Sequence, residues 1–242
     1  MGAIAAALQA CQNRIASACQ EAGRPANCAR LIAVGKTFPA AALREAHAAG
    51  QRVFGESYLQ EALPKLEQLA DLPLEWHFIG PVQSNKTRQI AARFDWVHGI
   101  EREKIAQRLS EQRPANLPPL NVCIQVNVSA EASKSGVAPE AALELAGAIA
   151  VLPNLRLRGF MTIPEPTQDI ELQHRRFRQA AELLQTARTT LGVSAIDLDT
   201  LSMGMSADLE AAIHEGATLV RVGTAIFGAR PTMENNTLEQ AR

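Results

Sequence analysis

The sequence predicts one (β/α)8 barrel, an α/β fold of the TIM type, with an extra helix at its N-terminus. Short apolar segments alternate eight times with helical segments, and no linker or change of composition interrupts them. The length of 242 residues is ordinary for such a barrel. A doubly wound sheet would need a glycine-rich dinucleotide turn after the first strand, and LIAVGKTFP contains none. We therefore interpret residues 1–242 as a single barrel domain.

Each element has its own pattern. Residues 3–22 carry apolar side chains at three- and four-residue intervals, as in a helix with one face against a larger body. The strands are short, apolar and closed by glycine or polar residues. We expect strands at residues 31–34, 52–57, 75–80, 96–100, 120–128, 158–163, 200–204 and 219–223. We expect helices between them at residues 40–49, 58–69 (despite Pro64), 84–94, 102–112, 139–151, 169–191 and 207–216.

Composition excludes several classes of partner. Hydrophobic residues make up 47% of the chain and charged residues 20%, with a net charge of −1. These values allow a sizeable core, and without a basic cluster they predict no nucleic-acid partner and no membrane partner. No apolar run reaches the roughly eighteen residues of a membrane span, and the apolar start AIAAALQA lacks the preceding basic residues of a signal peptide.

Neither the cysteines nor the histidines show a metal-binding pattern. Cys11, Cys19, Cys28 and Cys123 match no zinc or redox spacing, so we expect reduced thiols and a cytoplasmic protein. No cluster of histidine and acidic residues has the spacing of metal ligands, and no metal site is predicted. His77 lies inside an apolar strand, where a hydrogen-bonded core histidine is the favoured interpretation.

Lys36 is the candidate nucleophile. It follows the first strand and precedes the helix that opens at Pro39, the position where such barrels carry their chemistry. A phosphate-binding P-loop is excluded because Arg30 stands where that motif requires glycine. Two interpretations remain: a solvated lysine without a specific role, and an amine that forms an imine, since desolvation favours the neutral nucleophile.

A phosphate site is expected at the same mouth of the barrel. The loops after the seventh and eighth strands commonly bind phosphate in this fold through glycine backbone and a helix N-terminus. Gly204, Ser206, Gly223 and Thr224 fit that role. The amine would then lie on the opposite loop. Pyridoxal 5′-phosphate carries both a phosphate and an aldehyde, and so does a phosphosugar with a carbonyl group, so the spacing leaves both open.

Five segments together resemble one family. LIAVGKTFP, FGESYLQEA, EWHFIGPVQSNK, VNVSAEASKSG and LSMGMSADLEAAIHEGATLVRVGTAIFG occur in that order from about Leu31 to Gly228. They closely resemble the pyridoxal phosphate homeostasis proteins, whose fold is an alanine-racemase-like barrel of fold type III. FGES in the second segment, or GFMTIP elsewhere in the chain, would be weak evidence alone, whereas the third and fifth segments are specific.

The resemblance implies pyridoxal phosphate as cofactor, bound as a Schiff base to Lys36. Arg221 would face the pyridine nitrogen, where a permanent cation disfavours protonation of the ring and weakens carbanion chemistry. Ser57 stands where the family pattern usually has asparagine, near the ring, so its contact there is expected to change. The implied cofactor residues are Lys36, Ser57, Ser202, Gly204, Ser206, Arg221, Gly223 and Thr224.

Three functions follow, with different tests. The favoured one is a monomeric carrier without turnover that holds the cofactor and releases it to apo-enzymes. A small amino-acid racemase is the alternative, with Tyr58, the single tyrosine, as second base; the racemases' extra β-domain is not expected in the fourteen residues after Gly228. A phosphosugar aldolase is the third. Lys134 is interpreted as a solvated loop lysine or a secondary pyridoxal site.

Overall fold

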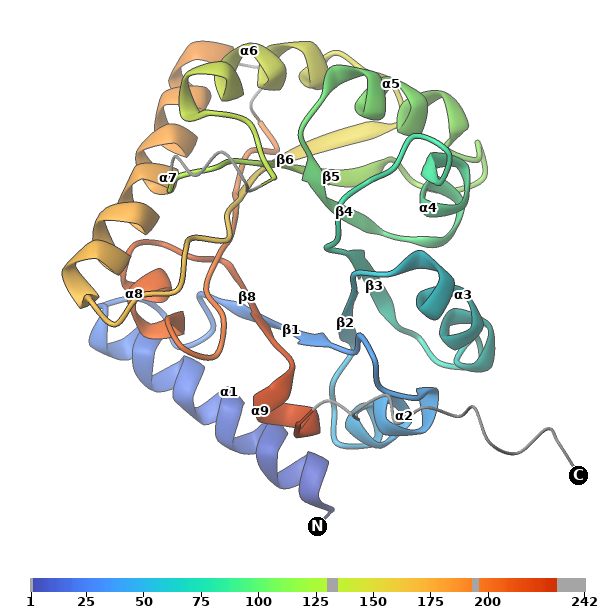
Figure 1. The fold of residues 1–242 in the computed structure, drawn as a ribbon, viewed down its shortest axis with the longest axis vertical. Helices are drawn as coiled ribbons and strands as arrows, with labels where there is room; N and C mark the ends of the chain where they lie inside the picture. The colour runs from blue at the N-terminus through green and yellow to red at the C-terminus, as the bar shows by residue number, and fades with distance from the viewer. Residues whose placement is uncertain (1, 130–134, 193–195, 230–242) are drawn as a thin grey trace, which may run out of the picture.

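The computed structural model describes residues 2–129, 135–192 and 196–229. Eight parallel strands follow one another in sequence order and close into a barrel, because β1 pairs with both β2 and β8. Helices surround this ring of strands, as Figure 1 shows. The predicted (β/α)8 fold is confirmed, and so is the additional N-terminal helix.

The elements agree with the sequence pattern to within a few residues. The strands are β1 (Arg30–Val34), β2 (Val53–Glu56), β3 (Glu75–Phe78), β4 (Trp96–Ile100), β5 (Leu120–Gln125), β6 (Leu155–Met161), β7 (Thr200–Ser202) and β8 (Leu219–Val222). The helices are α1 (Ala3–Glu21), α2 (Ala40–Ala48), α3 (Leu59–Gln68), α4 (Thr87–Arg93), α5 (Glu103–Gln112), α6 (Pro139–Ala150), α7 (Ile170–Leu191), α8 (Leu209–His214) and α9 (Thr224–Phe227).

Two apolar cores lie on the two sides of the barrel wall. The larger fills the space between strands and helices, and the smaller fills the interior of the ring. Alternate residues of each strand point to opposite sides, which explains why Ile32 belongs to the inner core and Ala33 to the outer one. The inner core contains Ile32, Val53, Trp96, Cys123, Met161 and Leu219.

Helix α1 covers one side of the ring, where it packs against α2, α8 and α9 (Figure 1). Its buried stripe is the predicted one, with Leu8, Cys11, Ile15 and Cys19 inside. The four cysteines are all free thiols. Among the described residues no helix is both long and apolar enough to cross a membrane.

Several boundaries differ by two or three residues from the sequence expectation. Strand β6 begins at Leu155 rather than at residue 158, because residues 155–157 pair with residues 120–122 of β5. Helix α4 begins only at Thr87, whose hydroxyl donates to Ser84 O at 3.0 Å and closes a turn before it.

Helix α8 is also shorter than expected. Asp208 Oδ1 accepts the Met205 amide at 2.6 Å, so residues 205–208 form a turn and the helix starts at Leu209. The short helix α9 was not expected at all, since four residues give no periodic pattern.

Candidate functional site

Lys36 stands on the inner side of the mouth, just past β1. Its predecessor Gly35 faces outward, because a Cβ there would meet Leu43 at 3.0 Å and Glu56 Oε1 at 2.8 Å. The strand alternation therefore places Lys36 toward the interior. Its side chain is half-buried. Ser57 lies beside Lys36 at the end of the neighbouring strand. Val34 pairs with Gly55, and Lys36 and Ser57 each follow these paired residues by two positions.

The loop after β8 is the immediate neighbour of the Lys36 loop. β1 and β8 pair from Arg30 opposite Leu219 to Ala33 opposite Val222. A Cβ on Gly223 would lie 3.1 Å from Val34 O, so the backbones touch at this point. The expectation that amine and phosphate loops stand on opposite sides of the mouth was wrong, because closure of the barrel joins its first strand to its last. One small ligand can thus reach both.

A buried ion pair supports the Lys36 loop from the outer side of the barrel wall. Lys65 Nζ donates to Glu56 Oε1 and to Gly35 O, both at 2.8 Å. Burial raises the pKa of Glu56 to about 6, although the charges of Lys65 and Lys36 act in the opposite direction. Because the ammonium group holds the Gly35 carbonyl, the pair fixes the backbone from which Lys36 projects.

The glycines expected to cradle a phosphate are sterically required. Gly204 has φ +93°, and a Cβ there would lie 2.6 Å from Ala212 Cβ. Ser206, half-buried in the next turn, presents its carbonyl to Arg14 NH1 at 2.8 Å. Thr224 is exposed and starts α9 directly after Gly223. The amides of Ile226 and Phe227 both donate to Gly223 O, at 2.9 and 3.0 Å, so the amides of Thr224 and Ala225 are the ones at this helix start that can reach an anion.

Gly204→Ala tests this backbone geometry. We expect a loss of about 1 to 2 kcal/mol in the free energy of unfolding from the positive φ, and a further loss of about 1 to 3 kcal/mol from the contact with Ala212. The matched control is Gly23→Ala, which has φ +67° and no atom within 4 Å of the added Cβ. Urea unfolding measures both. Equal losses in the two variants would contradict the proposed crowding at Gly204.

Arg221 lies in the barrel interior below the two loops and is 4% exposed. Its NH1 donates to Ser202 O and Ser202 Oγ, each at 2.7 Å, and its NH2 donates to Thr162 O at 2.9 Å. Burial lowers the pKa of Arg221 to about 10, so the side chain still carries its charge at neutral pH. Ser202 is fully buried, and its hydroxyl is engaged inside the barrel.

A chain of buried polar side chains runs from Arg221 across the interior. Ser202 Oγ lies 2.8 Å from His98 Nδ1, His98 Nε2 lies 2.8 Å from His77 Nδ1, and His77 Nε2 lies 2.7 Å from Glu75 Oε1. Burial lowers the pKa of both histidines, so both rings are neutral. His77 is thus a hydrogen-bonded core histidine, as predicted.

The two ends of this chain fix the direction of every proton in it. Arg221 can only donate and the Glu75 carboxylate can only accept. The Ser202 hydroxyl must then donate to His98, His98 to His77, and His77 to Glu75, which assigns the tautomer of each ring. All the polar groups are satisfied in this one arrangement. The chain therefore holds the Arg221 guanidinium in a single position under the mouth.

The remaining predicted residues lie at the edge of the mouth or outside the described part of the chain. Tyr58 precedes α3 and is 52% exposed. Ser57 is half-buried, with its carbonyl against Gly80. Lys134 lies outside the described residues.

Sequence reasoning missed the two groups that support the site, His98 and Lys65. His98 had one available signal, since both His77 and His98 are the third residue of consecutive strands. Lys65 had none, because a lysine on an amphipathic helix is normally solvated. The prediction of no metal site rested on spacing along the chain; in space, His174, His214 and Glu215 lie together.

Comparisons with known proteins agree with this geometry. The family model for the alanine racemase N-terminal domain matches residues 7–231. The pyridoxal phosphate homeostasis protein of Pseudomonas aeruginosa is 66% identical over 217 residues, which cover 90% of this chain and 91% of the relative. PipY of Synechococcus elongatus without PLP superposes with a TM-score of 0.83 at 35% identity, covering 93% of this chain and 100% of that one. The structure of PipY with PLP bound gives a TM-score of 0.77 at 35% identity, covering 88% and 100%.

The fold and the residues at the barrel mouth together define an alanine-racemase-type barrel. A lysine follows its first strand, and glycine-containing loops follow its last two strands. The same architecture is shared by PipY across almost the whole chain. The chain belongs to the family of pyridoxal phosphate homeostasis proteins.

Proposed function

We propose that this protein binds pyridoxal 5′-phosphate as a Schiff base on Lys36 and serves vitamin B6 homeostasis as a carrier without turnover. The adjacency of the Lys36 loop and the Gly223 loop supports this most directly, because it offers an amine and an anion site within reach of one small ligand. The family relation and the PLP-bound structure of PipY point to the same ligand.

The residues present fit this cofactor. When bound, the cofactor supplies an aldehyde and an electron-withdrawing ring. Lys36 Nζ would supply the amine that bonds to the aldehyde carbon with loss of water. Backbone groups at Gly204, Ser206, Gly223 and Thr224 would hold the phosphate, and Ser57 would lie near the ring. Ser202 acts through Arg221, whose position it fixes.

The position of Tyr58, together with Arg221, favours a carrier over a racemase, because the related racemases tolerate such a cation when a second base stands on the opposite face of the ring. The charge of Arg221 persists at neutral pH, and a cation beside the pyridine nitrogen keeps that nitrogen unprotonated. The ring then withdraws electrons less well, so carbanions at a bound amino acid are poorly stabilised. The exposed Tyr58 is also poorly placed to act as a second buried base. We propose that the protein acts as a monomer in the cytoplasm and that apo-enzymes receive the cofactor.

Borohydride reduction of the loaded protein, followed by peptide mass spectrometry, tests the covalent link. We expect a pyridoxyl group on the peptide that contains Lys36. Labelling confined to other lysines, or none at all, would overturn the proposal. Trapping of a sugar with no pyridoxyl label would instead indicate a phosphosugar aldolase.

Deuterium exchange at the α-carbon of amino acids separates carrier from racemase. In D₂O we expect the loaded protein to exchange alanine no faster than free pyridoxal phosphate does, because Arg221 disfavours the protonated ring. Nuclear magnetic resonance of the alanine signal measures the rate. Rapid exchange that is lost in Tyr58→Phe would show that the protein is a racemase.

A further inference from the structure

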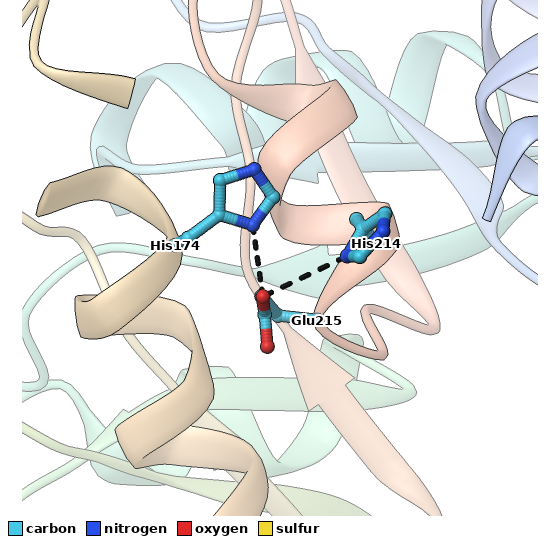
Figure 2. Close-up of side chains that lie close together, drawn as sticks. All are labelled: His174, His214 and Glu215. Carbon is cyan, nitrogen blue, oxygen red and sulfur yellow. Dashed lines mark hydrogen bonds and ion pairs between the residues drawn. The ribbon is translucent and has the colours of Figure 1, made fainter. Parts of the chain in front are cut away.

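Three potential metal ligands gather on the outside of the barrel, away from the mouth. His174 lies on α7, His214 is the last residue of α8, and Glu215 follows it. Figure 2 shows both imidazole rings turned toward the Glu215 carboxylate. His174 Nδ1 is 2.8 Å from Glu215 Oε1, and His214 Nδ1 is 3.7 Å from the same oxygen. The three donor atoms all lie within 4.8 Å of one another.

We propose that His174, His214 and Glu215 form a binding site for a divalent transition-metal ion, with zinc as the best match. Zinc binds imidazole nitrogen and carboxylate oxygen at about 2.0 to 2.2 Å, so its ligands stand about 3.3 Å apart in a tetrahedron. The two nitrogen-to-oxygen distances of 2.8 and 3.7 Å lie on either side of that value, and side-chain rotations would bring the three donor atoms to it. Two imidazoles and one carboxylate are also a donor set that zinc prefers over calcium or magnesium.

The surroundings of Glu215 orient its carboxylate for this role. Its side chain is only 9% exposed, and Arg178 holds it through Nε to Oε2 at 3.1 Å and through NH2 to Oε1 at 2.8 Å. A metal on Oε1 would displace the bond from Arg178 NH2, whereas the bond from Arg178 Nε would keep Oε2 in place, as outer hydrogen bonds do in known metal sites.

The site is open on the other side. The His214 side chain is 60% exposed and that of His174 is 22% exposed, so an ion can enter from solvent. A pocket of about 480 Å³ adjoins the two rings and extends along α8 to Ala207 and Glu210. Three protein ligands leave a fourth position for water or a small anion from this pocket. The ion would link α7 to α8, whose packing brings these residues together.

Titration of the metal-stripped protein with zinc chloride in a calorimeter tests the site. We expect one zinc ion per chain and at least tenfold weaker binding in His214→Ala. His214 is the variant of choice because its exposed side chain contributes little to the fold. The matched control is His47→Ala, a histidine on α2 outside the cluster, and it should bind zinc like the natural protein.

Cobalt(II) gives a second readout that separates this site from the free thiols. Binding at two imidazoles and a carboxylate should produce visible ligand-field bands without a thiolate charge-transfer band. Zinc should also raise the thermal unfolding midpoint of the natural protein and of His47→Ala, and not that of His214→Ala. Absence of saturable zinc binding, equal affinity in His214→Ala, or thiolate-type cobalt bands would overturn the proposal. None of these readouts depends on pyridoxal phosphate, so the two proposals fail independently.

Discussion

Replacing Lys36 by alanine should remove the covalent link to pyridoxal phosphate and its absorbance band near the visible edge. The phosphate contacts remain, so we expect residual binding, weaker by roughly one to two powers of ten, or about 1.4 to 2.8 kcal/mol. Fluorescence titration measures the affinity. Stability should stay within about 0.5 kcal/mol, because Lys36 is half-buried and its removal creates no cavity in either core.

Lys86→Ala is the matched control, since Lys86 is another half-buried lysine at the same mouth, after β3. It should keep the absorbance band and the affinity of the natural protein. An unchanged band in Lys36→Ala, with the pyridoxyl group then found on Lys134 or elsewhere, would show that the covalent site lies outside the β1 loop.

Lys65→Met should be the most destabilising single change in the site. It leaves the Glu56 carboxylate buried without its cation, and breaking a buried ion pair in this way costs about 3 to 5 kcal/mol. It also removes the hydrogen bond to Gly35 O. Urea unfolding gives the free energy. The second variant, Lys65→Met with Glu56→Gln, should recover most of the loss because no charge remains buried.

The same substitution at the exposed Lys104 on α5 serves as control and should change stability by less than about 0.5 kcal/mol. If the double variant is as unstable as Lys65→Met alone, the cost comes from the lost hydrogen bond to Gly35 O. Binding of the cofactor by the double variant then measures how far the pair positions Lys36.

Periodicity and composition were sufficient to predict the barrel. Each strand is an apolar run with a clear end, and the N-terminal helix shows its buried stripe in Leu8, Cys11 and Ile15. Boundaries were less accurate where a contact outside the apolar pattern decides them. Residues 155–157 belong to β6 because they pair with β5, and Asp208 ends a turn by accepting the Met205 amide.

The site residues could be predicted only where local sequence defines the chemistry. Lys36 ends an apolar strand, and Gly204 and Gly223 mark backbone approaches, all of which are local signals. Their arrangement was mispredicted in one respect, because which strands close a ring is a property of the whole fold. His98 and Lys65 have the composition of ordinary core and surface residues, and only their partners in space reveal their roles.

The pairing of β1 with β8 also has a mechanical consequence. The barrel closes where its first strand pairs with its last. A molecule bound by Lys36 after β1 and by Gly223 after β8 would bridge these two strands. Because such a ligand is joined covalently at one end only, it stabilises the barrel by binding the folded state and not by restricting the unfolded chain. Loading with the cofactor should therefore raise the free energy of unfolding above that of the unloaded protein.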